Sequence, residues 1–172
     1  MELNGDKFEC LRYGSDHTLQ SQTSYKSNSG SDIQDKDSVR DLGVTMSNDG
    51  TFKRHIDNVV TEAKSQCSWI FRTFGTRQVI PMLTLWKALV QSKLDYCSQL
   101  WSPLTKGHIQ SVEMVQRSFF RKISGMSSLP YWEQLHQLKT YSLERRRERY
   151  RVIYVWRILE GHIPNVMNAD GQ

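Results

Sequence analysis

The sequence has few of the features that mark membrane, secreted or disulfide-bonded proteins. No apolar run among its 172 residues approaches the ~20 residues of a bilayer-spanning helix, and the mean hydropathy is −0.59. The N-terminal residues MELNGD form neither a basic n-region nor an apolar h-region, so we expect no secretory signal. The cysteines Cys10, Cys67 and Cys97 are odd in number and far apart. They argue against a disulfide framework and favour an intracellular location, nuclear or cytoplasmic.

The motifs of a self-contained active site are also missing from the sequence. Two-metal polymerases and nucleases need carboxylates that converge on the metal ions, yet no two acidic residues are adjacent here. The sequence holds no Gly-rich phosphate loop, no CxxC or HExxH spacing and no GxSxG turn. We therefore expect no catalytic residues, no metal ligands and no cofactor. We interpret the scattered histidines as surface or capping residues: His55, His108, His136 and His162.

Charge is distributed unevenly along the chain. Residues 1–50 hold five Lys or Arg and nine Asp or Glu, whereas the remaining residues hold 18 basic and nine acidic ones. All five tryptophans lie in the basic part. An acidic, Ser-rich start followed by a basic, aromatic body favours a nucleic-acid partner. The alternative is a solvated helical surface that is merely rich in arginine.

The apolar pattern predicts a mainly α protein: a bundle of four to five helices, preceded by a short two-strand β remnant and a polar loop. Residues 1–14 and 39–46 are the strand candidates, and residues 15–38 are too polar to form a packed core. From Phe52 the period becomes helical, and Ser142 is a good N-cap for the last helix. The predicted helices cover about 52–74, 81–94, 106–124, 130–138 and 142–161.

Arginine is concentrated in the last predicted helix. Bidentate contact with phosphate is a property of the guanidinium fork, so we expect this helix to contact a phosphate backbone. A second basic group lies in the 106–124 helix and would extend the same surface. The candidate nucleic-acid-binding residues are Arg145, Arg146, Arg147, Arg149, Arg151, Arg117, Arg121 and Lys122. The alternative is a salt-bridged helix face that is solvated or docks on the bundle.

An ordered set of short motifs resembles the reverse transcriptases of LINE-type (non-LTR) retrotransposons, nearest to the jockey and chicken-repeat group. No single motif is specific, but their order and spacing hold over about residues 3–165. The matching segments are LNGDKFE (3–9), RDLGV (40–44), FKRHI (52–56), LDYCSQLWSP (94–103), EMVQR (113–117), YWEQL (131–135) and SLERRR (142–147). One departure is Gln134, at a position where the family usually has arginine.

The resemblance implies a C-terminal fragment of an RNA-directed DNA polymerase. Residues 1–50 would be a palm-end remnant, 51–165 a thumb-like helical domain and 166–172 a tail. Lys7 would match the lysine of the fourth palm motif, a general acid toward departing pyrophosphate. The catalytic Asp-Asp motif is absent, so we expect a chain that is inactive alone and binds RNA or an RNA–DNA duplex through phosphates. The missing palm and fingers are a second expected partner, and a membrane is not one.

Two other hypotheses stay open on the sequence alone. One is a helical protein-interaction module without a nucleic-acid role, using a surface rich in tryptophan: Trp86, Trp101, Trp132 and Trp156. The other is a fragment that is unstable without the palm, since a lone strand pair is marginal in water.

Overall fold

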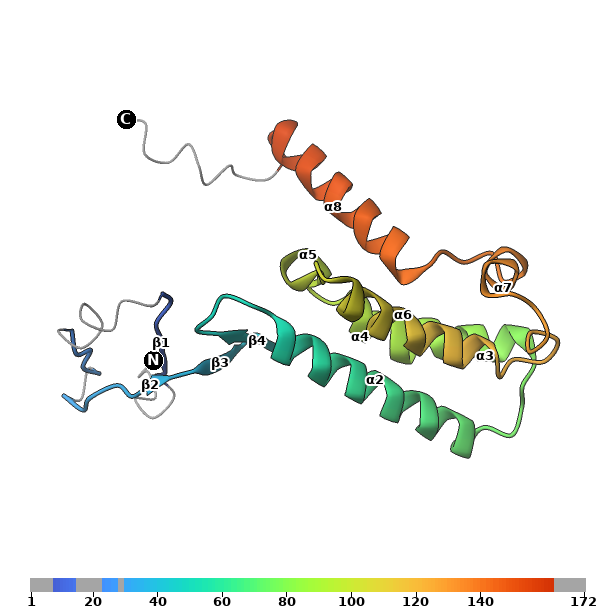
Figure 1. The fold of residues 1–172 in the computed structure, drawn as a ribbon, viewed down its shortest axis with the longest axis horizontal. Coiled ribbons are helices and arrows are strands. Elements are labelled where there is room, and N and C mark those ends of the chain that lie inside the picture. Colours follow the sequence, from blue (N-terminus) through green and yellow to red (C-terminus); the bar gives the residue numbers. More distant parts are fainter. Residues whose placement is uncertain (1–7, 15–22, 28–29, 163–172) are drawn as a thin grey trace. The chain divides into compact units, whose positions relative to one another are not determined.

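The computed structural model describes residues 8–14, 23–27 and 30–162. Figure 1 shows the order of the elements along the chain. The chain forms two compact units, Met1–Asp57 and Asn58–Gln172. The division falls inside the first long helix, a short distance after the boundary predicted at Gly50. Lys7 lies outside the described residues.

The first unit contains two short strand pairs. Strand β1 (Cys10–Leu11) pairs in parallel with β2 (Asp35–Lys36), and β3 (Ser38–Asp41) pairs antiparallel with β4 (Val44–Ser47). The single strand predicted over residues 39–46 is therefore wrong, because the chain reverses at Leu42 and Gly43. Both residues have positive φ, 45° and 86°, as the tight turn of a two-residue hairpin requires. An ion pair between Arg12 and Asp35 (2.8 Å) joins the β1 and β2 segments.

The second unit is helical, as predicted. Helix α2 (Lys53–Thr73) starts in the first unit and supplies most of its length to the second. The chain continues through α3 (Val79–Leu85), a π-helical turn η2 (Trp86–Gln91), α4 (Ser92–Asp95), α5 (Ser98–Trp101), α6 (Lys106–Phe120), α7 (Tyr131–Gln137) and α8 (Leu143–Leu159). The predicted helix over 106–124 stops early, since α6 ends at Phe120 and turns follow to Pro130.

Aromatic side chains form the centre of the helical unit. The Phe119 ring of α6 lies 4.8 Å from the Phe71 ring of α2 and 5.1 Å from the Trp86 ring of η2, measured between centroids. Phe120 packs edge-on against Trp86. Trp86 and Trp101 are fully buried, so they are core residues and do not belong to the Trp-rich surface of the interaction hypothesis.

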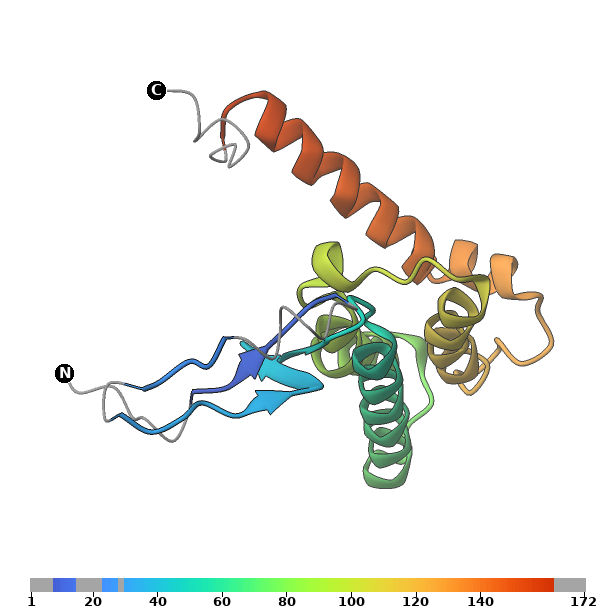
Figure 2. The ribbon, with the colours of Figure 1, turned by 60° about the vertical axis from the view of Figure 1, so that its left-hand side comes forward.

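Helix α8 differs from the other helices because only its beginning is buried. It contacts α5 and α6, and its buried residues are Leu143 and Arg147. Its second half runs away from the other helices of the unit (Figure 2). The fold class is the predicted one: mainly α, with small β elements before the helices. Within the described ranges, no helix is long and apolar enough to cross a membrane.

We expect Phe119→Ala to lower the free energy of unfolding by about 3–5 kcal/mol, because it leaves a cavity between three helical segments. Trp132→Ala is the matched control: Trp132 is 67% exposed. Its loss should change stability by less than about 0.5 kcal/mol. Urea denaturation followed by circular dichroism measures both. Equal losses in the two variants would contradict this description of the core.

Candidate nucleic-acid interface

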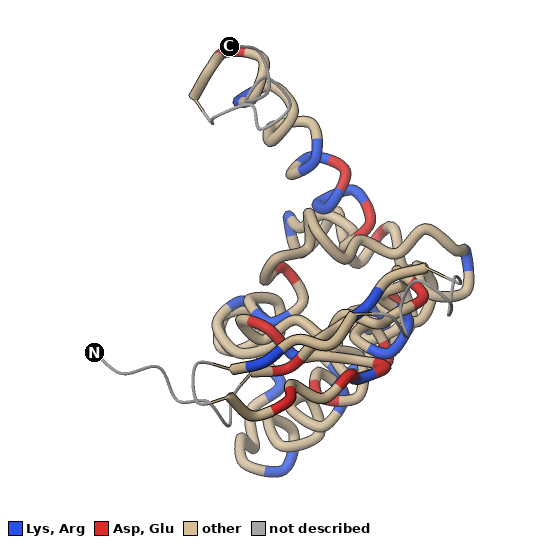
Figure 3. The backbone as a smooth tube through the Cα atoms, turned by 90° about the vertical axis from the view of Figure 1, so that its left-hand side faces the viewer, with Lys and Arg blue, Asp and Glu red and all other residues tan. Residues whose placement is uncertain are grey.

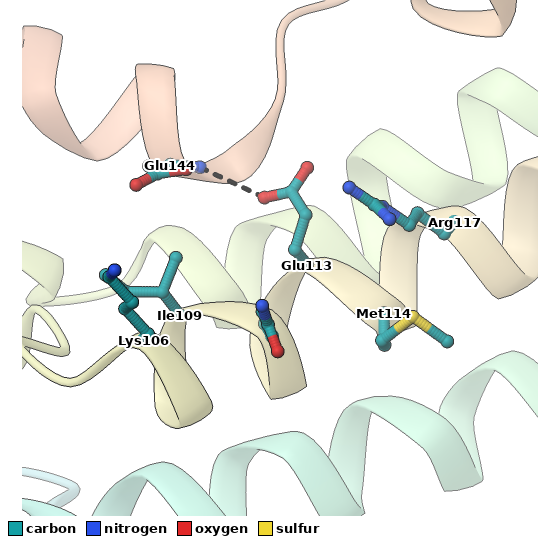
Figure 4. Close-up of a pocket in the computed structure, with 7 residues that line it drawn as sticks. Lys106, Ile109, Glu113, Met114, Arg117 and Glu144 are labelled. Atoms are coloured by element: carbon teal, nitrogen blue, oxygen red, sulfur yellow. Dashed lines mark hydrogen bonds between the residues drawn. The ribbon is translucent and has the colours of Figure 1, made fainter. Parts of the chain in front are cut away.

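The interface candidate is built on a buried carboxylate, Glu113 of α6. Its two oxygens accept hydrogen bonds from the backbone N–H groups of Leu143 (3.3 Å) and Glu144 (3.2 Å), the first residues of α8. The Tyr131 hydroxyl donates a third bond to the same carboxylate. Figure 4 shows Glu113 pointing from α6 to the start of α8. The free N–H groups of a helix N-terminus carry partial positive charge, so this contact anchors α8 on α6.

Side chains on either side of Glu113 complete the anchor. The predicted N-cap is confirmed, because the Ser142 hydroxyl accepts from the Arg145 N–H (3.2 Å). Gln116, one turn after Glu113 on α6, donates to the carbonyl oxygen of Tyr141 (3.1 Å).

Gln134, at the position where the reverse transcriptases of the resemblance usually have arginine, is buried and donates to two backbone carbonyls, Met126 and Leu129. Gln134 therefore fixes the turn before α7 and does not face solvent.

The exposure expected for Arg147 is wrong. Arg147 is 3% exposed, because it lies one turn after Leu143 on the buried side of α8. Burial lowers its pKa, while the charges of Glu113, Glu144 and Asp95 act in the opposite direction. No hydrogen-bond partner is present for its Nη1 and Nη2 atoms in the described part of the chain. Arg147 is a structural cation beneath α8 and not a phosphate ligand.

Tyr131 shares this buried environment. Burial raises the pKa of its hydroxyl, and the hydrogen bond to Glu113 raises it further. The hydroxyl consequently stays protonated and remains a donor to the carboxylate. On its other side, the Tyr131 ring lies 4.5 Å beneath the Arg117 guanidinium.

The remaining arginines of α8 are accessible. Arg145, Arg149 and Arg151 are exposed, and Arg146 is half-buried in an ion pair with Asp95 of α4 (2.7 Å). The Arg145 guanidinium lies over the ring of Tyr141, 5.3 Å from its centroid. Tyr141, Arg145, Arg146 and Arg149 together line one cavity. The structure thus groups three of the predicted arginines, with Tyr141 and Asp95 as neighbours that the sequence did not indicate.

The basic residues of α6 lie elsewhere. Arg117 shares a cavity of about 470 Å³ with Lys106 and two acids, Glu113 and Glu144 (Figure 4). Lys122 lies over the Phe71 ring (4.8 Å) and lines a different cavity, between α2 and α6. Arg121 is exposed just after α6. The single surface expected from the sequence is divided into separate groups, of which the α8 group brings the most arginines, three, around one cavity with no acid in its lining.

The second half of α8 is mostly uncharged and exposes apolar side chains. Figure 3 shows charged residues gathered in the first half of the helix and mostly uncharged residues beyond. Trp156 is 52% exposed, and Val152, Val155 and Leu159 are exposed with it. Because a helix turns about 100° per residue, these four positions share one face, opposite the buried Leu143 and Arg147. This apolar stripe replaces the predicted four-tryptophan surface.

The histidines and acids form no metal centre among the described residues, where no group of three or more His, Cys, Asp or Glu has suitable geometry. His55 is buried and accepts a hydrogen bond from the Thr45 N–H through Nδ1 (3.2 Å). This contact ties β4 to the first turn of α2 within the first unit. The interpretation of His55 as a surface or capping residue is therefore wrong, because its ring is buried against the strand pair.

We expect Glu113→Ala to lower the free energy of unfolding by about 2–4 kcal/mol, because two helix N–H groups and the Tyr131 hydroxyl lose their acceptor. Glu148→Ala, at an exposed position of α8, is the control and should cost less than about 0.5 kcal/mol. Urea unfolding gives both values. If Glu113→Ala behaved like the control, the anchor would have no energetic importance.

The comparisons with known proteins assign no family. No family model matches the chain, and no solved structure matches it. The chain is similar to an uncharacterized protein of Caenorhabditis elegans, with 26% identity over 133 residues that cover 74% of this chain and 67% of that protein.

Proposed function

We propose that this chain binds nucleic acid through the phosphate backbone, using the exposed arginines at the start of α8. The observation that carries the proposal is the grouping of Arg145, Arg146 and Arg149 around one cavity whose lining contains no acid. Phosphate oxygens are the natural ligands of several convergent guanidinium groups. Such contacts are independent of base sequence, so the proposal predicts binding to any duplex of suitable shape.

The ordered motifs give this proposal its biological setting. They support a place after the palm in a reverse transcriptase of the non-LTR type, where a thumb-like helical domain holds the template–primer duplex. The proposal concerns binding alone, since polymerisation in that family belongs to palm carboxylates whose motif is not in this sequence. An RNA–DNA hybrid is therefore the ligand to test first.

The direct test is a charge-reversal pair, Arg145→Glu with Arg149→Glu. We expect the affinity for an RNA–DNA hybrid to fall at least about tenfold, and the slope of log K against log salt to flatten by roughly two, because two phosphate contacts are lost. Fluorescence anisotropy at several salt concentrations measures both quantities.

The matched control reverses two exposed lysines outside the α8 group, Lys87→Glu with Lys93→Glu. It changes the net charge equally and should leave most of the affinity in place. Equal losses in both pairs would point to overall charge, and would contradict a role for the α8 arginines. Circular dichroism verifies that each variant is folded.

The protein-interaction hypothesis keeps one specific observation in its favour, the exposed stripe of Val152, Val155, Trp156 and Leu159. The same titration separates the two hypotheses. Failure of a folded wild-type chain to bind any hybrid at low salt would reject the nucleic-acid proposal and leave the interaction module as the better account.

A further inference from the structure

The cavity at the start of α8 has an unusually one-sided lining. It measures about 240 Å³ and is bounded by Tyr141, Arg145, Arg146 and Arg149. On a helix with 3.6 residues per turn, the three arginines fall within an arc of about 100°. The nearby acids Glu144 and Glu148 fall on the adjacent arc and do not line this cavity. Arg145, Arg146 and Arg149 therefore form a basic group on α8 apart from Glu144 and Glu148, whereas Arg147 and Arg151 fall beside these acids.

Neighbouring groups hold two of the arginines in place before any ligand arrives. Arg145 rests on the Tyr141 ring, and the Arg146 Nη2 atom donates to Asp95 Oδ2 (2.7 Å) and to the Tyr150 hydroxyl (2.6 Å). Ordering these side chains in advance reduces the entropy that binding would otherwise cost.

Donors remain available in this cluster. Arg145 and Arg149 are exposed, whereas the Nε atom of Arg146 is buried without a hydrogen-bond partner in the described part of the chain, so Arg146 contributes charge and not a donor. Arg149 has no ion-pair partner within the described ranges. Since guanidinium groups offer donors and no acceptors, the cavity is suited to an oxyanion.

Charge and size narrow the ligand further. The three arginines, offset only by Asp95, give the cluster a net charge of +2. A phosphomonoester carries about −1.5 to −2 at pH 7, whereas each internal phosphate of a strand carries a single negative charge. The volume of about 240 Å³ is below the roughly 300–1,000 Å³ of pockets that enclose whole ligands, so the cavity accommodates a phosphate group and does not enclose a whole nucleotide.

We propose that this cavity binds the terminal phosphomonoester of a nucleic-acid strand in preference to an internal phosphodiester. The inference rests on the proposed function and adds to it a preference for phosphorylated strand ends. Arg145 and Arg149 supply the free donors, and Arg146 supplies a fixed positive charge at the base of the cluster. Tyr141 and Asp95 act as positioning residues, because they hold Arg145 and Arg146 in place.

The test compares two short RNA–DNA hybrids that differ only in a 5′-phosphate or 5′-hydroxyl on one strand, titrated against the full chain by anisotropy. We expect the phosphorylated hybrid to bind roughly tenfold more tightly, as a charge-assisted contact with a dianion would give. The preference should shrink as pH falls from about 7 to about 5, because the monoester loses its second charge near pH 6 while arginine stays protonated.

Two double variants of equal charge change locate the effect. Arg145→Ala with Arg149→Ala should abolish the preference. Arg151→Ala with Arg157→Ala should weaken both hybrids alike and preserve the preference. Loss of the preference in the second pair would overturn the assignment to this cavity, as would tighter binding of a phosphoserine peptide than of the phosphorylated hybrid.

The outcomes for the inference and for the proposed function are distinct. Equal, salt-dependent binding of both hybrids by the wild-type chain overturns the phosphomonoester site and leaves backbone binding intact. Absence of binding to either hybrid by a folded chain rejects backbone binding and the site together.

Discussion

The contact between the Glu113 carboxylate and the first N–H groups of α8 is the constraint on which the functional surface depends. Glu113 is buried, and its acceptor capacity is directed at Leu143, Glu144 and Tyr131. The direction in which α8 leaves the bundle is set by this junction. The positions of Arg145, Arg146 and Arg149 follow from it, because they lie in the first two turns after the anchored residues.

The same junction divides the arginines of α8 by role. Arg147 faces inward near Glu113 and Asp95, where it neutralises acidic charge at the cost of losing water. Arg145 and Arg149 face outward and keep donors for a ligand. Arg146 lies between these two environments, ion-paired on one side and lining the cavity on the other. A run of arginines in the sequence therefore contains one structural residue and three with a direct part in the proposed binding site.

The sequence was sufficient to predict the helices and the helix start that depend on neighbouring residues alone. Apolar periodicity predicted α2, α6 and α8, and the hydroxyl of Ser142 predicted where α8 begins. The hairpin of β3 and β4 was missed because Leu42, an ordinary apolar residue, adopts a positive φ that no turn motif in the sequence predicts. The burial of Arg147 was missed because its acidic neighbours Asp95 and Glu113 come from other helices. Glu113 could have been recognised in the sequence as an acid on the apolar side of a predicted helix. Its role could not, because its partners Tyr131, Leu143 and Glu144 lie far along the chain.

The central claim is that the outward arginines at the start of α8 are the residues that contact phosphate. Arginine-specific dicarbonyl modification, followed by mass spectrometry with and without an RNA–DNA hybrid, tests it most directly. The account predicts that the hybrid protects Arg145 and Arg149, while Arg72 on the exposed side of α2 reacts equally in both samples. Protection of Arg72 alone, or no change at Arg145 and Arg149 in a sample that binds the hybrid, would contradict it.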